Sequence, residues 1–259
     1  MKVVILCGGL GTRLKEETEF RPKPLVQIGE KPILWHIMKI FSHYGYNDFI
    51  LCLGYKGEMI KEYFLNYDYM NSDFTMDLGC KKDAKFYGNH CESDWTVTLA
   101  NTGVDTNTGG RIKRIERYIG KDETFLAAYG DGVADIDLKK LIEHHRKKGK
   151  TATLTGVHPY SRFGVVEAGA DDIVHGFKEK PRMDGWANVG FFVFQRQIFD
   201  YLEDNSVLET KPLETLSQKS QLAIYRHQGF WQCMDTFKDQ KVIQGLWDTG
   251  KPPWKVWND

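Results

Sequence analysis

Short apolar runs alternate along the chain with segments whose apolar residues recur at helical spacing. Val3–Cys7 is a continuous apolar run that stops at two glycines, as expected of a strand buried on both faces of a parallel sheet. Pro32 opens a segment in which Ile33, Ile37 and Phe41 share one helical face. Because this alternation repeats, it predicts a sheet of mainly parallel strands covered by helices.

The same patterns locate the remaining elements. Further strands are predicted at 49–53, 95–100, 124–129, 151–157, 165–167, 174–177, 189–194 and 222–225. Further helices are predicted at 57–65, 137–148, 197–202, 213–219 and 238–247. The predicted fold class is α/β: one Rossmann-like domain over 1–259, with a mixed, mostly parallel sheet flanked by helices. A polar stretch at about 67–110 reads as an elaborated insertion within that domain.

Composition narrows the possible functions. The 259 residues carry 35 basic and 35 acidic side chains, so a uniformly basic nucleic-acid binder is not expected. No apolar run approaches the roughly 18 residues of a membrane span, and the N-terminal run is too short for a signal peptide. The cysteines are odd in number and form no Cys-x-x-Cys pair, which favours a reducing cytoplasm over a disulfide framework or zinc site. They are Cys7, Cys52, Cys80, Cys91 and Cys233.

A glycine-rich loop follows the first strand. It reads Gly8-Gly9-Leu10-Gly11-Thr12-Arg13, and Pro22-Lys23-Pro24 comes close behind. Glycines let backbone N–H groups approach a phosphate chain, while Arg13 and Lys23 supply positive charge. Leu14 stands where a dinucleotide-binding loop needs its third glycine, and the loop lacks the Gly-Lys-Ser/Thr ending of a Walker A motif. We therefore predict a different kind of phosphate site, the alternative being a tight turn with solvated charges.

Two carboxylates follow apolar stretches. Asp131 comes after the strand 124–129, and Asp235 ends the apolar stretch 229–234. Open α/β sheets place their ligand contacts at such strand ends. A hard cation such as Mg²⁺ binds one or two carboxylates together with phosphate oxygens. The two aspartates are therefore candidate metal ligands, unless they serve only as caps of a helix or turn.

Three further motifs carry charge. Glu179 and Lys180 precede Pro181, which is expected to hold Lys180 in an extended backbone; the alternative is a plain surface ion pair. Gly109 and Gly110 precede Arg111 and could open a helix whose N-terminus faces an anion; the alternative is a glycine turn with a solvated arginine. The adjacent pair His144 and His145 is predicted to be solvated on the polar face of its helix.

These motifs together resemble the signature of the sugar-1-phosphate nucleotidyltransferases, a glycine loop ending in Gly-Thr-Arg followed by Pro-Lys-Pro. The stretches 32–39, 54–57, 108–111, 129–135 and 229–236 resemble in particular the members that transfer a cytidylyl group from CTP to glucose 1-phosphate. The likeness runs nearly end to end. The chain departs from that pattern at Cys7, Arg21, Val189 and Cys233.

The resemblance assigns roles to individual residues. It implies nucleotide contacts from Leu6, Cys7, Gly8, Gly9, Leu10, Gly11, Thr12, Arg13, Lys23, Thr106, Arg111 and Gly130. It implies sugar-phosphate contacts from Glu179, Lys180, Asn188 and Gly190. Asp131 and Asp235 would hold one Mg²⁺ per active site, and Arg13, Lys23 and Asp131 would be catalytic. The sugar phosphate is already an ionised nucleophile, so no general base is expected.

The resemblance also implies a homo-oligomer, with a hexamer as the expected assembly, and small-molecule substrates without a nucleic-acid or membrane partner. The insertion could pack on a neighbouring subunit and carry Arg111 to that subunit's nucleotide, or fold as a flap over its own site. Several alternatives stay open from sequence. These are a different sugar, UTP or dTTP in place of CTP, and a non-catalytic nucleotide-sugar sensor.

Overall fold

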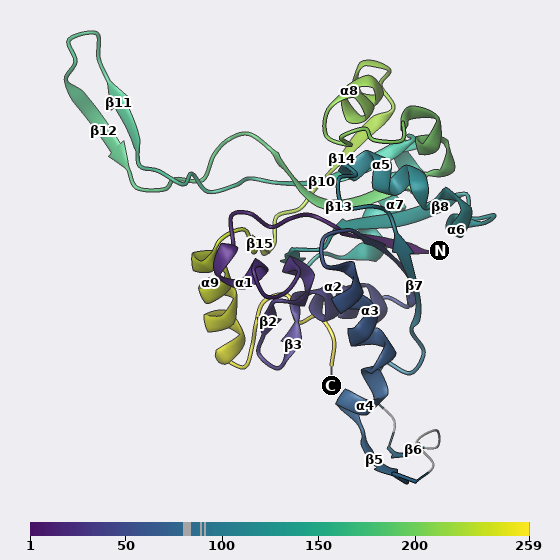
Figure 1. Ribbon diagram of the computed structural model, residues 1–259. Helices are drawn as coiled ribbons and strands as arrows, with labels where there is room; N and C mark the ends of the chain where they lie inside the picture. Colours follow the sequence, from purple (N-terminus) through teal and green to yellow (C-terminus); the bar gives the residue numbers. More distant parts are fainter. Residues whose placement is uncertain (80–83, 89, 91, 259) are drawn as a thin grey trace.

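A central mixed sheet forms the framework of the molecule (Figure 1). The computed structural model describes residues 1–79, 84–88, 90 and 92–258. Within these residues the sheet has seven strands in the order β14-β10-β13-β8-β1-β4-β7, and β13 alone runs antiparallel to its neighbours. They are β1 (Val3–Cys7), β4 (Asp48–Leu53), β7 (Thr96–Asn101), β8 (Thr124–Tyr129), β10 (Ala152–Val157), β13 (Ala187–Gln195) and β14 (Leu222–Arg226). The predicted fold class is confirmed.

Helices cover both faces of this sheet because alternate strand residues point to opposite sides. On one face Ile5 of β1 packs with α2, α3, α7 and α9; on the other face Val4 packs with α5, α6, η2 and α8. The α-helices are α1 (Lys15–Thr18), α2 (Ile33–His43), α3 (Gly57–Leu65), α4 (Tyr67–Asn71), α5 (Thr108–Arg114), α6 (Glu116–Ile119), α7 (Leu138–Lys148), α8 (Lys211–Gln218) and α9 (Phe237–Asp248). The 3₁₀ helices are η1 (Lys23–Leu25) and η2 (Arg196–Tyr201), so the segment predicted as a helix at 197–202 is wound more tightly.

Four two-stranded pairs lie outside the central sheet in the described part of the chain. They are β2 (Gln27–Ile28) with β3 (Lys31–Pro32), β5 (Asp73–Met76) with β6 (Ala84–Tyr87), β9 (Gly132–Ala134) with β15 (Trp231–Cys233), and β11 (Val165–Ala168) with β12 (Val174–Lys178). The last pair is antiparallel and matches the strands predicted at 165–167 and 174–177.

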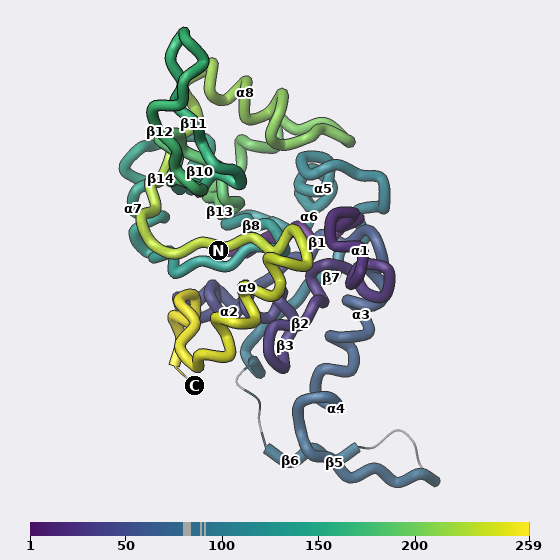
Figure 2. The backbone as a smooth tube through the Cα atoms, turned by 90° about the vertical axis from the view of Figure 1, so that its left-hand side faces the viewer, coloured from purple at the N-terminus to yellow at the C-terminus, as the bar shows by residue number. Residues whose placement is uncertain are grey.

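Two of these pairs project from opposite ends of the molecule in both views (Figures 1 and 2). The β11–β12 ribbon extends from the end that carries α8, and the β5–β6 hairpin lies beyond α4. The hairpin belongs to the polar stretch 67–110, but β7 in the same stretch pairs with β4 as the edge strand of the central sheet. The stretch is therefore not one continuous excursion from the sheet.

Two histidines are fully buried in neutral form. His36 lies among Trp35, Trp247, Trp254 and Trp257, and its Nε2 is 2.9 Å from the carbonyl of Ile28. Burial lowers the pKa of His36 to about 4.

His145 is buried on the sheet side of α7. Its Nδ1 lies 2.8 Å from the Thr153 hydroxyl, and its Nε2 lies 2.8 Å from the amide nitrogen of Gln195. Burial, and then the charge of neighbouring His144, lower the pKa of His145 to about 4. The prediction that this pair is solvated is wrong for His145 and only partly right for half-buried His144. A polar residue at that position contacts the sheet because it finds partners there.

The described residues include no helix both long and apolar enough to cross a bilayer. Of the five cysteines, Cys80 and Cys91 lie outside the described residues, whereas Cys7, Cys52 and Cys233 are free thiols. Cys7 and Cys52 are buried in the core.

Acid should destabilise this fold through its two buried histidines. The unfolded chain takes up protons below the ordinary histidine pKa of 6.5, whereas His36 and His145 stay neutral until about pH 4. The free energy of unfolding should therefore fall as the pH drops from about 6.5 to about 4. In denaturant melts across this range, His145→Gln should reduce the dependence of the unfolding free energy on pH by the equivalent of about one proton. His175→Gln, at an exposed histidine, is the control for a general effect of the substitution. An unchanged pH dependence in His145→Gln would contradict the assignment.

Candidate active site

A small cavity of about 230 Å³ opens where the carboxyl ends of β1 and β8 meet the start of α9. It is lined by Leu6, Cys7, Gly9, Gly11, Thr12, Arg13, Lys23, Pro24, Gly130, Asp131 and Asp235. The glycine loop after β1 forms one wall. The structure therefore brings most of the predicted nucleotide and metal residues to one place. Four predicted nucleotide residues do not line the cavity: Gly8, Leu10, Thr106 and Arg111.

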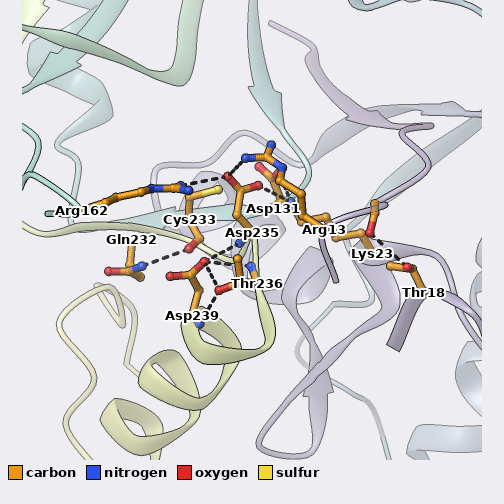
Figure 3. Close-up of polar contacts among 11 residues, drawn as sticks. Arg13, Thr18, Lys23, Asp131, Arg162, Gln232, Cys233, Asp235, Thr236 and Asp239 are labelled. Carbon is orange, nitrogen blue, oxygen red and sulfur yellow. Dashed lines mark hydrogen bonds and ion pairs between the residues drawn. The ribbon is translucent and has the colours of Figure 1, made fainter. Parts of the chain in front are cut away.

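Lys23 connects the two aspartates. Lys23 stands between Pro22 and Pro24 at the start of η1, and its Nζ is 2.7 Å from Asp131 Oδ2 and 2.8 Å from Asp235 Oδ1 (Figure 3). Burial alone would lower the pKa of Lys23, but its contacts with the carboxylates outweigh burial and raise that pKa. The ammonium is therefore charged throughout the physiological pH range.

Asp235 also forms ion pairs with two arginine side chains. Its Oδ2 is 2.7 Å from Arg13 Nη1 and 3.6 Å from Arg162 Nη2. Burial would raise the pKa of Asp235, but the hydrogen bond and charge of Lys23, together with Arg13, lower it. Asp235 is therefore an anion held by three positively charged side chains in the described part of the chain.

The local backbone fixes Asp235 at the start of α9. Thr236 caps that helix by accepting from the backbone N–H of Asp239, and the Asp239 carboxylate accepts in return from the backbone N–H of Thr236. The same carboxylate accepts from the backbone N–H of Asp235 at 3.2 Å. This capping box holds the residue before the cap in a fixed position.

Gly130 is required by the packing of β8 beside β1. A Cβ at this position would lie 2.7 Å from the carbonyl oxygen of Leu6. The absence of a side chain lets the turn that carries Asp131 lie close against the end of β1, where the glycine loop begins. The carboxylate and the loop can then face the same small cavity.

Cys233 is a member of the site that sequence reasoning did not assign. Its thiol and the carboxylates of Asp131 and Asp235 offer ligand atoms that all lie within 4.8 Å of one another. Burial, then the charge of Asp131, raise the pKa of the Cys233 thiol well above its usual range, so the thiol is neutral. The departure from the family pattern at this position was the available signal. Arg162, the other residue of the site that was not assigned from sequence, gave no such signal. It lies far along the chain from the glycine loop, just before β11.

Arg111 is buried and directs its guanidinium at its own chain. It donates to the carbonyls of Gly8, Leu53, Gly103 and Val104 at 2.7–3.1 Å and to the Thr102 hydroxyl at 2.9 Å. These acceptors lie at or just after the ends of β1, β4 and β7, so one side chain ties three strand ends together. The alternative of a solvated arginine is wrong: only 4% of Arg111 is exposed. Its contact with a nucleotide stays a prediction.

Gly109 and Gly110 lie inside α5, which begins at Thr108. A Cβ on Gly110 would lie 2.4 Å from the carbonyl oxygen of Asp204, and one on Gly109 would lie 2.6 Å from the Ser206 hydroxyl. Their role in the structure is close packing against that loop. The predicted helix opening is confirmed, because both glycines lie in the first turn of α5. The N–H of Gly110 donates to the Ser206 carbonyl at 2.9 Å, and an anion at this helix end stays a prediction.

The predicted sugar-phosphate residues fall into two groups. Asn188 and Gly190 lie on β13, where Asn188 Nδ2 is 3.3 Å from the Tyr129 hydroxyl and a Cβ on Gly190 would meet the Tyr129 ring at 2.0 Å. They therefore flank the end of β8, two residues before Asp131. Glu179 and Lys180 are exposed at the base of the β11–β12 ribbon and pair with each other at 3.0 Å.

The backbone of Lys180 differs from the prediction. It has a φ of +46°, in the left-handed region, instead of the extended conformation expected before a proline. The chain turns sharply here because Pro181 returns across Ser161, whose N–H donates to the Pro181 carbonyl at 2.8 Å. Pairing between the two ends of the ribbon thus overrides the local preference set by Pro181.

The chain is similar to known proteins over nearly its whole length. The sequence model of the family described as "Nucleotidyl transferase" matches residues 2–259. The chain belongs to the nucleotidyl transferase family.

Relatives within this family include a glucose-1-phosphate cytidylyltransferase of Salmonella typhimurium. It is 50% identical over 259 residues, covering 99% of this chain and 100% of the relative. A probable glucose-1-phosphate cytidylyltransferase of Bacillus subtilis is 49% identical with the same coverage. Among solved structures, HddC from Yersinia pseudotuberculosis has a TM-score of 0.67 at 25% identity, covering 95% of this chain and 99% of that one.

Arg111 should contribute strongly to stability. Removing its guanidinium in Arg111→Met leaves several buried carbonyl groups without their donor, so the free energy of unfolding should fall by about 3 kcal/mol. Arg114→Met is the matched control in the same helix. Arg114 donates to the Thr102 carbonyl at 2.7 Å, so its loss should cost about 1 kcal/mol. Equal destabilisation in denaturant melts would argue against the proposed role of Arg111.

Proposed function

We propose that the protein transfers a cytidylyl group from CTP to α-D-glucose 1-phosphate, giving CDP-glucose and pyrophosphate. The observation that carries the reaction class is the convergence of Arg13, Lys23, Asp131 and Asp235 in a cavity walled by the glycine loop. The full-length likeness to relatives described as glucose-1-phosphate cytidylyltransferases supports the choice of base and sugar.

The reaction is an in-line displacement at the α-phosphorus. A phosphate oxygen of the sugar phosphate forms the new P–O bond, and the bond from the α-phosphorus to the bridging oxygen breaks as pyrophosphate leaves. That nucleophile is ionised at neutral pH and needs no general base, which fits the lack of histidine among the described lining residues. Catalysis then rests on positioning and on neutralising charge that builds on the phosphates.

Arg13 and Lys23 carry that positive charge. Arg13 is 64% exposed in its side chain and presents a forked guanidinium at the mouth of the cavity, where the departing pyrophosphate would lie. Lys23 is more buried, with 12% of its side chain exposed, and would face the α-phosphate. The backbone around Leu6, Cys7 and Gly8 would face the base.

Asp131 and Asp235 would hold one Mg²⁺. Two carboxylates beside a phosphate-binding loop are the donor set that this cation takes in nucleotide-dependent enzymes. The two carboxylates lie close enough together to hold the same ion. When bound, the ion neutralises charge on the triphosphate. The neutral thiol of Cys233 is a poor ligand for so hard a cation, so the two carboxylates would carry the binding.

The sugar phosphate would contact Glu179 and Lys180 from the ribbon and Asn188 and Gly190 from β13. The Glu179 carboxylate would accept hydrogen bonds from sugar hydroxyls, and the Lys180 ammonium would pair the phosphate. Both side chains are more than half exposed, which leaves them accessible to a ligand.

A homo-oligomer is part of the proposal. The β5–β6 hairpin projects from the body, and Tyr69, Phe74 and Tyr87 on and beside it are exposed. Aromatic side chains are enriched in protein interfaces. The alternative of a flap over the chain's own site is disfavoured, because no described residue of the hairpin lines the cavity around Lys23.

Pyrophosphate release tests the substrates directly. CTP, UTP, dTTP, ATP and GTP are each combined with glucose, galactose and mannose 1-phosphates in the presence of Mg²⁺. The expected result is turnover at least about tenfold faster for CTP with glucose 1-phosphate than for other pairs, because specific base contacts discriminate by a few kcal/mol. Faster use of UTP or dTTP would reassign the base. No turnover with any pair, with nucleotide binding retained, would favour a sensor.

Removing one proposed metal ligand should abolish turnover without unfolding the chain. Asp131→Asn keeps the size of the side chain but weakens its hold on a cation, so the rate should fall by about a hundredfold or more. Asp137→Asn is the control: that carboxylate caps α7 and lies outside the cavity. Near-normal Mg²⁺-dependent turnover in Asp131→Asn would refute the assignment.

A further inference from the structure

The Lys23 ammonium lies between the two carboxylates that the proposed function gives to a metal ion. It contacts Asp131 Oδ2 at 2.7 Å and Asp235 Oδ1 at 2.8 Å, and its side chain is only 12% exposed. Asp235 is 14% exposed in its side chain. The Lys23 ammonium is therefore a cation that already bridges these two carboxylates in the free protein.

One position cannot hold both cations. A divalent ion bound to the facing oxygens of both aspartates would stand in the place of the ammonium, and like charges that close repel strongly with little water to screen them. A lysine side chain has a flexible four-carbon stem, so its ammonium can move to a new acceptor without moving the backbone. Phosphate oxygens of a bound triphosphate would be such acceptors.

We propose that Lys23 is a placeholder cation: it holds Asp131 and Asp235 together in the free protein and leaves them for the triphosphate, after which a divalent metal takes the carboxylates. This proposal rests on the proposed function, which supplies the metal and the triphosphate. It follows that metal and nucleotide bind cooperatively, each raising the affinity of the protein for the other by the same factor. The free protein binds metal weakly.

Arg13 provides a contrast within the same cluster. It also pairs with Asp235, at 2.7 Å, but through the other carboxylate oxygen and from a side chain that is 64% exposed. Arg13 does not bridge the two aspartates among the contacts of the described residues. Removing it deletes one positive charge beside the site without emptying the position between the carboxylates, so it controls for the general effect of charge.

The test is a titration of the nucleotide-free protein with Mn²⁺, whose free fraction is followed by electron paramagnetic resonance. Lys23→Met should bind Mn²⁺ about tenfold more tightly than the unmodified protein, because the metal no longer competes with two charge-assisted hydrogen bonds. Arg13→Met should bind it less than about threefold more tightly. Equal affinities in Lys23→Met and the unmodified protein, or equal gains in both variants, would overturn the proposal.

A double variant distinguishes a failure of the proposed metal site from a failure of the placeholder role. Asp235→Asn added to Lys23→Met should remove the gain in Mn²⁺ affinity. If the gain persists, the metal binds elsewhere, and the proposed metal site fails together with the placeholder. If the gain never arises while Asp131→Asn still abolishes Mg²⁺-dependent turnover, the placeholder alone fails.

Thermal melts of the unmodified protein keep the proposal testable if Lys23→Met does not fold. Mn²⁺ alone should leave the melting temperature nearly unchanged. A CTP analogue with a non-cleavable α,β-bond should raise it, and the two together should raise it by more than the sum of the separate shifts. An equal shift from Mn²⁺ with and without the analogue would contradict the placeholder role.

Discussion

The ion pairs of Lys23 with Asp131 and Asp235 are the interaction on which the site depends. They join three segments that are far apart in the chain: the turn after the glycine loop, the end of β8 and the start of α9. Each segment is fixed by its own local device, namely two prolines, a glycine packed against the end of β1 and a capping box. The cavity takes its shape from the meeting of these three devices and its charge from the cations gathered on Asp235.

A second constraint lies just behind the cavity. Arg111 ties the ends of β1, β4 and β7, and its guanidinium occupies space that any side chain at Gly8 or Gly54 would need. The glycines of this region therefore serve two purposes. Some line the phosphate cavity, as the sequence suggests, and others make room for a buried arginine. The sugar-side residues are arranged more loosely, since Glu179 and Lys180 stand exposed on a projecting ribbon.

Most of the fold could be predicted because the strands are continuous apolar runs and α3 and β8 end where the pattern ends. The pairing of Lys23 with both aspartates could not be predicted, because sequence spacing does not reveal which distant strand ends meet. The burial of two polar side chains, Arg111 and His145, could not be predicted, and the reason is the same for both. Arg111 and His145 are polar by type, yet backbone carbonyls and facing hydroxyl and amide groups satisfy them inside the fold. Arg162 entered the site only through tertiary contacts, whereas Cys233 lies two residues before Asp235 in the sequence.

The central claim is that one position between Asp131 and Asp235 is held by the Lys23 ammonium first and by a metal once a nucleotide is bound. Anomalous diffraction from crystals containing Mn²⁺ and a non-cleavable CTP analogue tests it most directly. The account predicts an anomalous peak between the two carboxylates, with Lys23 Nζ moved onto a phosphate oxygen. A peak elsewhere, or Lys23 still bridging both aspartates beside a bound nucleotide, would contradict it.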